Sequence, residues 1–203
     1  EGSAKVPLLI TGPNCQQGAK IDTPVTLVDI YPTLMDIADI ERPSGLDGYS
    51  LMPELTGSTT EHPGWAMSEY HECSINTGTF MLREGPWKLI VYVGYPSLLF
   101  NLDEDPDEIH DYSTERPDVV ERMDRTLREI VDYEAVDAEV KAYNRAAFRQ
   151  WRDEETAKGN YRNEMARIHS GFDDLSPDDI VPWTDDDERV IDEWLAAGVW
   201  PPR

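Results

Sequence analysis

Three consecutive apolar runs between positions 80 and 102 form the strongest pattern in the chain. Phe80–Arg83, Trp87–Tyr92 and Leu98–Leu102 are rich in β-branched, aromatic and leucine residues, and Gly-Pro or Gly-Tyr-Pro turns separate them. Short runs of this kind are typical of antiparallel strands joined by tight turns. The pattern therefore predicts an antiparallel meander. The acidic residues 103–108 end it, because clustered carboxylates repel and the proline among them has no amide to donate.

The residues before the meander predict a strand, a helix and a further strand. Val6–Thr11 is an unbroken apolar run, which favours a strand buried on both faces of a parallel or mixed sheet. Apolar residues between positions 27 and 38 recur at three- and four-residue steps, the spacing of a helix, and we expect that helix to begin near Asp29 or Ile30. Trp65–Tyr70 is the further strand candidate.

The residues after the meander predict helices. Beyond Pro117 an amphipathic helix with Ser113 or Thr114 as its cap is predicted by the apolar positions Val120, Met123, Leu127, Ile130 and Val131. From about Asp137 the chain becomes more polar. Helical spacing there continues past Trp151, resumes at 161–169, and ends in a short helix closed by Gly198.

Four tryptophans in this polar tail need an apolar surface to pack against: Trp151, Trp183, Trp194 and Trp200. The sequence leaves two candidates for that surface: the body of a larger parent protein and a neighbouring subunit. The second alternative would make the tail a site of homo-oligomer formation.

Composition narrows the function classes. The chain has 203 residues, and Asp+Glu 41 against Lys+Arg 18 gives a net charge of −23. Such a field repels nucleic-acid phosphates and anionic lipid, so we expect neither nucleic acid nor membrane as a partner. Strong acidity also suits a protein from a salty habitat. Cys15 and Cys73 lack metal spacing and form no disulfide framework, which favours the cytoplasm slightly.

Five motifs in this order resemble the C-terminal part of the sulfatase family, which belongs to the alkaline-phosphatase-like superfamily. They are Glu1–Ile10, Thr26–Leu34, Leu46–Leu51, Met81–Ile90, and Leu99–Leu102 with Asp105–Glu108. The resemblance covers roughly residues 1–130. Because the chain opens inside a motif and without Met, we expect a portion of a longer protein.

The resemblance implies an α/β fold that is locally α+β. Residues 1–56 would be the terminal strand and helix of the α/β sulfatase core. Residues 57–135 would form a C-terminal subdomain with a four-stranded antiparallel sheet and a packed helix. Residues 136–203 would form an acidic, tryptophan-bearing helical tail.

The resemblance also implies a Ca²⁺ ion and a formylglycine, made from Cys or Ser in a Cys/Ser-x-Pro/Ala-x-Arg motif. Neither Cys15 nor Cys73 has an Arg four residues on, so no catalytic or metal-binding residue is assigned to this chain. The acidic runs 103–105 and 185–188 lack the spacing of a calcium loop and are interpreted as solvated turns and caps. We therefore expect the catalytic portion to lie N-terminally in the same protein, and this chain alone to be inactive.

One loop is a candidate for contact with substrate. The loop after Trp65–Tyr70 lies near the rim of the active site in sulfatases, and here it carries His71 and Glu72 beside Glu69. Histidine can donate a hydrogen bond or a proton near neutral pH, and carboxylates can bind hydroxyl or cationic groups. The alternative is an ordinary surface histidine. The other histidines, His62, His110 and His169, are interpreted as surface residues.

The resulting hypothesis is a C-terminal portion of a sulfatase that hydrolyses sulfate esters of a sugar or another small organic molecule. A phosphonate or phosphodiester hydrolase of the same superfamily is one alternative. A stand-alone, non-catalytic interaction module that binds a partner through its acidic tail is another.

Overall fold

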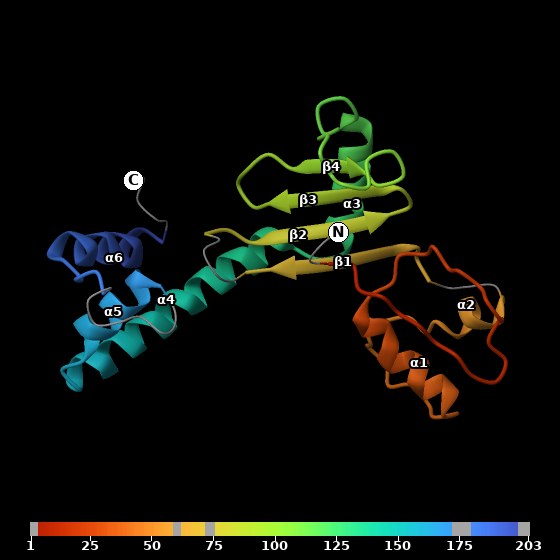
Figure 1. The fold of residues 1–203 in the computed structure, drawn as a ribbon, viewed down its shortest axis with the longest axis horizontal. Coiled ribbons are helices and arrows are strands. Elements are labelled where there is room, and N and C mark those ends of the chain that lie inside the picture. Colours follow the sequence, from red (N-terminus) through yellow and green to blue (C-terminus); the bar gives the residue numbers. More distant parts are fainter. Residues whose placement is uncertain (1–3, 59–61, 72–75, 172–179, 199–203) are drawn as a thin grey trace. The chain divides into compact units, whose positions relative to one another are not determined.

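The computed structural model describes four stretches of the chain, residues 4–58, 62–71, 76–171 and 180–198. These stretches fall into two compact units (Figure 1). The first, called the sheet unit, comprises Glu1–Tyr70 and Gly78–Tyr133, and the second, called the helical unit, comprises His71–Thr77 and Glu134–Arg203. In the four described stretches, none of the helices has the length and apolar composition that a membrane crossing requires.

A four-stranded antiparallel sheet forms the centre of the sheet unit. Its strands follow chain order: β1 (Trp65–Tyr70), β2 (Thr79–Glu84), β3 (Trp87–Tyr92) and β4 (Leu98–Asn101). Leu89 of β3 lies opposite Leu82 on one side and Leu99 on the other, and all three side chains are fully buried. Because alternate residues of a strand share one face, this row marks the buried face of the sheet. The predicted meander and its four strands are confirmed.

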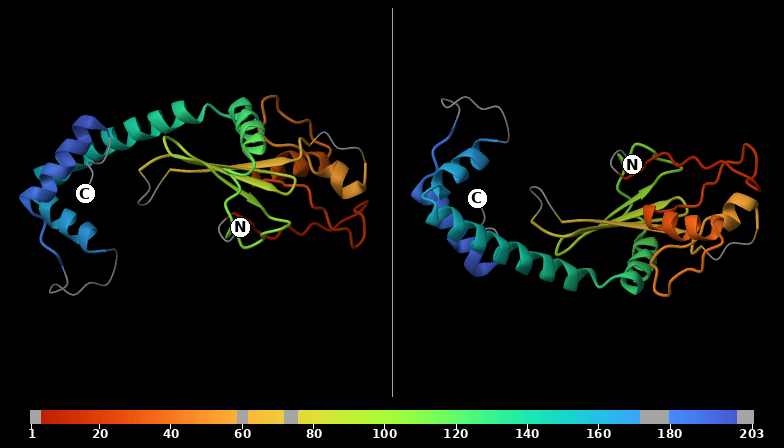
Figure 2. Two further views of the ribbon diagram at one scale, coloured as in Figure 1. Left: turned by 90° about the horizontal axis from the view of Figure 1, so that it is seen from above. Right: turned by 90° about the horizontal axis from the view of Figure 1, so that it is seen from below.

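Helix α3 (Pro117–Ile130) covers this sheet, packing against β2 and β3. Figure 2 shows α3 lying over one face. Val119, Met123 and Leu127, spaced four residues apart, are its buried side chains, as helix geometry requires for one apolar stripe. The predicted cap was wrong: Arg116 is the N-cap residue, and the Ser113 hydroxyl donates to Asp111 Oδ2 at 2.9 Å instead.

The residues before β1 contain a 3-10 turn, η1 (Leu27–Asp29), and two helices, α1 (Ile30–Ile37) and α2 (Met52–Thr56). The predicted start of the first helix is confirmed. The predicted strand at Val6–Thr11 is wrong for this chain. These residues have no regular structure, and Val6 and Leu9 are 60% and 95% exposed. A strand needs hydrogen-bonding neighbours, and in the described stretches the sheet consists of β1–β4 alone.

The helical unit contains α4 (Tyr133–Ala157, which begins at the last residue of the sheet unit), α5 (Tyr161–Ser170) and α6 (Asp185–Ala197). Its core consists of Tyr161, Met165, Ile191 and Leu195, against which Phe148, Trp151, Trp183 and Trp194 pack. Trp151, Trp183 and Trp194 thus pack within the tail itself, a surface that the sequence did not indicate. Packing of the tail on a parent body or on a neighbouring subunit stays a prediction. Trp200 lies outside the described residues.

Three arginines of α4 bind the carboxyl-terminal half of α6. Arg145 and Arg149 donate to the carbonyls of Gly198 (3.4 Å) and Leu195, and Arg152 pairs with Asp192 at 2.7 Å. The spacing 145, 149, 152 places them on one face of α4, and the last carbonyls of a helix have no partner within it. Cationic side chains at this end also complement the helix dipole. The three arginines therefore dock α6 antiparallel to α4.

Glu188 on α6 gathers donors from the rest of the helical unit. Its carboxylate accepts hydrogen bonds from Trp183 Nε1 at 2.8 Å and from the Tyr161 hydroxyl at 3.1 Å. Burial, followed by the Glu188 charge, raises the pKa of Tyr161 to about 12. The phenol is therefore protonated at neutral pH and can donate. The interpretation of residues 185–188 as a cap is confirmed, since Thr184 and Asp187 form a capping box at the start of α6.

Candidate functional site

Two of the three predicted substrate residues lie in the described part of the chain, at the end of β1 and directly after it. Glu69 lies near the end of the edge strand β1, with an exposed side chain, opposite Phe80 of β2. His71 directly follows β1, is half-buried, and belongs to the helical unit. Glu72 lies outside the described residues. Their part in substrate binding remains a prediction.

A buried carboxylate, Asp29, organises the region between α1 and β1. Its Oδ2 accepts a hydrogen bond from the backbone N–H of Thr26 at 2.7 Å, and its Oδ1 accepts one from the N–H of Tyr49 at 2.8 Å. The third partner is His62, whose Nε2 lies 3.4 Å from Oδ2. The side chains of Asp29 and His62 are each only 1% exposed. A carboxylate buried to this degree requires such donors, because an unpaired buried charge is strongly destabilising.

The hydrogen bonds of His62 define its tautomer. The backbone N–H of Gly64 donates to Nδ1 at 3.1 Å, so Nδ1 carries no proton. Nε2 therefore carries the proton of the neutral ring and donates it to Asp29. The interpretation of His62 as a surface residue was wrong, because its ring lies between this carboxylate and the chain entering β1.

Gly48 allows the Asp29 network to form. A Cβ atom at this position would lie 2.1 Å from the carbonyl oxygen of Val28, which no side chain can accommodate. The close approach brings the N–H of the next residue, Tyr49, within reach of Asp29. The segment that contains Gly48 and Tyr49 is held at a second point, where Thr33 Oγ1 accepts a hydrogen bond from the backbone N–H of Leu51 at 2.8 Å. Two of the sequence motifs, 26–34 and 46–51, thus meet at one carboxylate.

Two other motifs meet at a second ion pair. Lys88 Nζ of β3 lies 3.0 and 2.8 Å from the two carboxylate oxygens of Glu108, and the side chains are only 7% and 17% exposed. Burial raises the pKa of Glu108, but hydrogen bonds, that from Lys88 first, outweigh it and bring the pKa below its ordinary value. This pair ties the acidic turn after β4 to the middle of the sheet.

Neither pair has the geometry of a catalytic dyad. A general base must reach a proton of the substrate, directly or through one water molecule. Both ring nitrogens of His62 are already engaged by protein groups, and its side chain is enclosed. The arrangement instead holds backbone segments in place. Asp29 and His62 therefore belong to the framework of the region that leads into β1.

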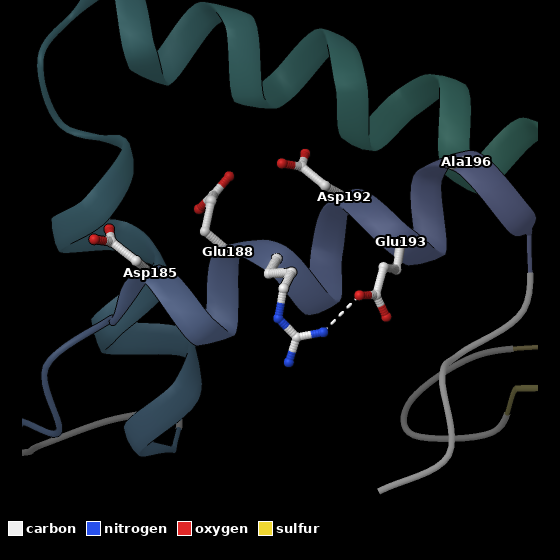
Figure 3. Close-up of a pocket in the computed structure, with 6 residues that line it drawn as sticks. Asp185, Glu188, Asp192, Glu193 and Ala196 are labelled. Carbon is white, nitrogen blue, oxygen red and sulfur yellow. Dashed lines mark hydrogen bonds and ion pairs between the residues drawn. The ribbon is translucent and has the colours of Figure 1, made fainter.

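A hollow with a volume of about 440 Å³ lies along one face of α6. It is lined by Asp185, Glu188, Arg189, Asp192, Glu193 and Ala196. Figure 3 shows the lining residues on a single helix. Arg189 Nη1 lies 2.5 Å from Glu193 Oε1. Asp185 and Arg189 are mostly exposed. Solvated charges on one helix make a weak ligand site, because water competes for each of them.

The residues described here do not provide the donor set of the implied metal centre. In the four described stretches, no three His, Cys, Asp or Glu side chains come close enough to hold a metal ion. Cys15 is a half-buried free thiol, and Cys73 lies outside the described residues. The Ca²⁺ ion and the formylglycine therefore fit no group of residues in this part of the chain.

Sequence reasoning missed the Asp29–His62 pair for two different reasons. Asp29 was interpreted as the start of a helix, although a charged residue between Val28 and Ile30 was a signal of a special environment. His62 offered no signal, since it lies in a polar stretch between Glu61 and Pro63. Its burial results from a contact between residues 33 positions apart.

Comparison with known proteins gives the family. Residues 1–133 match the family described as N-sulphoglucosamine sulphohydrolase, C-terminal. Arylsulfatase K of Danio rerio is 40% identical over 205 residues, covering 96% of this chain and 37% of the relative. Arylsulfatase K of Homo sapiens is 37% identical over 215 residues, covering 99% of this chain and 38% of the relative. The chain thus spans less than two fifths of the length of these relatives.

Solved structures agree with the family. A structure described as a 2-O GAG sulfatase matches with a TM-score of 0.52 at 27% identity, covering 58% of this chain and 27% of that one. A putative sulfatase from Bacteroides thetaiotaomicron matches with the same TM-score, identity and coverage. The four-stranded antiparallel sheet with its packed helix is the sulfatase C-terminal subdomain.

Proposed function

Because the chain belongs to the family of sulfatase C-terminal domains, we propose that its parent protein hydrolyses sulfate esters and that this chain supplies the flank of the active site. The observation that carries the proposal is the family match over residues 1–133. All the described residues of the sheet unit lie within that match. The relatives in which nearly the whole chain finds a counterpart are arylsulfatases.

The substrate class that we propose is an O-sulfated sugar. Support comes from the structural relative described as a 2-O GAG sulfatase, which is 27% identical to this chain over the matched part. The free hydroxyls of a sugar suit the carboxylate of Glu69, an exposed group at the end of an edge strand.

We propose that the remaining portion of the parent covers the apolar surface of α1. Tyr31, Leu34 and Ile37 on this helix are more than half exposed, although Pro32 and Thr33 on its other side are buried. A cluster of exposed apolar side chains on one helix face is normally covered by protein. Val6–Thr11, which has no strand partner here, would gain one from the same portion. That portion would also hold the Ca²⁺ ion and the formylglycine.

The test of the substrate role is His71→Ala in the full-length parent, with His110→Ala as control. His110 is exposed and pairs with Glu115 at the surface of the sheet unit. We expect His71→Ala to lower kcat/KM for a sulfated sugar roughly 10-fold, the effect of losing one hydrogen bond to the reacting complex, and His110→Ala to leave it unchanged.

The substrate panel separates the alternatives. It should include an aryl sulfate, a sulfated sugar, a phosphonate monoester and a phosphodiester. Turnover of the two phosphorus esters alone would replace the sulfatase proposal with its superfamily alternative. An unchanged kcat/KM of His71→Ala across all sulfate esters would remove His71 from the substrate site.

A further inference from the structure

We propose that Asp29 and His62 are positioning residues. They fix the position of β1, and of the predicted substrate residues at its end, relative to α1. The inference rests on the proposed function, because it assigns a role to the strand that carries Glu69 and leads into His71. It concerns two residues to which neither the motifs nor the relatives assign a role.

The first step is the path from α1 to β1. Asp29, just before α1, contacts His62, and the N–H of Gly64 contacts the other side of the same ring. Gly64 precedes Trp65, the first residue of β1. A single neutral imidazole therefore connects the start of the helix to the start of the strand.

The second step is a parallel path through Tyr49. Its backbone N–H donates to Asp29, and its ring stacks edge-on against both His62 (centroids 5.5 Å apart) and Trp65 (6.5 Å). Edge-to-face pairs of this kind fix ring orientation as well as distance. Both paths begin at the carboxylate of Asp29 and end at the start of β1, the first at Gly64 and the second at Trp65.

The third step is the place of β1 in the sheet. β1 is an edge strand, so β2 is its only strand neighbour in the described residues. An edge strand is held less firmly than a central one, and the Asp29–His62 pair anchors its first end. The exposed face of α1, the helix that Asp29 immediately precedes, is the surface proposed to pack on the catalytic portion. The pair thus links the residue just before α1 to the start of the strand that carries Glu69.

The experiment compares His62→Asn with His62→Gln in the full-length parent. A glutamine amide extends as far as Nε2 and can still donate to Asp29, whereas an asparagine amide ends near Nδ1 and retains only the partner of that atom, Gly64. Both variants lose the ring and its contact with Tyr49, so they are matched in that loss. We expect His62→Asn to raise KM for a sulfated sugar roughly 3- to 10-fold with little change in kcat, because small displacements of positioning groups weaken binding. His62→Gln should lie between His62→Asn and wild type, because it keeps the bond to the buried Asp29 carboxylate but loses the acceptor for the N–H of Gly64.

Hydrogen exchange of the β1 amides provides a readout that does not depend on activity. Faster exchange over residues 65–70 in His62→Asn than in His62→Gln supports the positioning role. Equal exchange in the two variants would overturn it. If exchange responds as expected but no variant, His71→Ala included, changes KM, then the positioning stands and the proposed substrate role of this end of β1 falls.

A second variant keeps the test decisive if His62→Asn does not accumulate as folded protein. Tyr49→Leu removes the ring contacts with His62 and Trp65 and leaves the backbone hydrogen bond to Asp29 in place. Faster β1 exchange in Tyr49→Leu supports the inference. Exchange equal to that of the wild type would count against it. Asp22→Asn, at an exposed carboxylate paired with Lys20, is the control for changes remote from the anchor.

Discussion

The sheet unit and the helical unit of this chain are held together in different ways. The sheet unit has an apolar core, in which the side chains of Leu82, Leu89, Leu99, Met123 and Leu127 are all fully buried. The helical unit has four buried core residues, surrounded by aromatic side chains that are only partly buried. It relies more heavily on arginines and on the Glu188 carboxylate to join its helices.

This difference teaches how sequence pattern relates to packing. A two-layer structure of sheet and helix encloses side chains completely, so its apolar positions repeat regularly and are easily recognised. Three helices of 10 to 25 residues cannot enclose much volume, so large aromatics cover the core from its edge. Hydrogen bonds and ion pairs then fix the orientation of these helices relative to one another, which apolar burial alone does not do.

The largest expected effect is a difference in stability loss between truncation in the core of the sheet unit and truncation in the core of the helical unit. Leu89→Ala should lower the free energy of unfolding of the sheet unit by about 2–5 kcal/mol, because it leaves a cavity in a fully buried site. Leu195→Ala, at a 5% exposed position of the helical unit, should cost less, since partly exposed neighbours can collapse into the space. Hydrogen exchange of peptides from β3 and α6, measured in urea, reports each unit separately. A larger cost for Leu195→Ala would refute the comparison.

The buried ion pair of the sheet unit should give a smaller, pH-dependent effect. Glu108→Gln should lower the free energy of unfolding by about 1.5–3 kcal/mol at neutral pH, the value of hydrogen bonds to charged groups. The pKa of Glu108 in the folded chain lies below its ordinary value of 4.5. Its contribution is therefore complete above that pH and is lost as the pH falls through the folded-state pKa.

The measurement is chemical denaturation of the chain and of Glu108→Gln between about pH 3 and pH 7, a range that spans the usual carboxyl pKa. The difference in stability should be constant near neutrality and should shrink on acidification. Glu115→Gln, which removes the carboxylate of an exposed pair with His110, is the matched control and should have little effect. A difference that grows toward low pH would contradict the assignment.

The smallest expected effect tests the arginine contacts of the helical unit. Gly198 has a φ of 76°, and a Cβ there would lie 2.8 Å from Arg145 Nη1. Gly159 has a similar φ of 71° but open space around it. Both Gly→Ala changes should cost about 1 kcal/mol through backbone strain. Gly198→Ala should cost a few tenths of a kcal/mol more by displacing Arg145 from α6. Thermal unfolding followed by tryptophan fluorescence measures the difference, and equal costs would show that Arg145 contributes nothing.

Most of the fold could be predicted because it depends on local pattern. All four strands of the sheet unit were placed to within a residue or two, and the helices at 30–37 and 117–130 followed from apolar spacing. The prediction failed at Val6–Thr11, where the run is apolar but no strand lies beside it in the described residues. It also missed the packing of Trp151, Trp183 and Trp194 within the tail, because the sequence does not indicate that three polar helices pack on one another.

The sequence by itself determined the family and the order of elements, since motifs, turns and apolar periods are properties of neighbouring residues. Only the tertiary structure decided what the motifs do for one another. Asp29 and His62 are 33 residues apart, and Lys88 and Glu108 are 20 apart. Each pair meets across a folded backbone, where burial makes a charge costly unless a partner is present. No local pattern encodes such a meeting, because the chain must fold before either charge is removed from water.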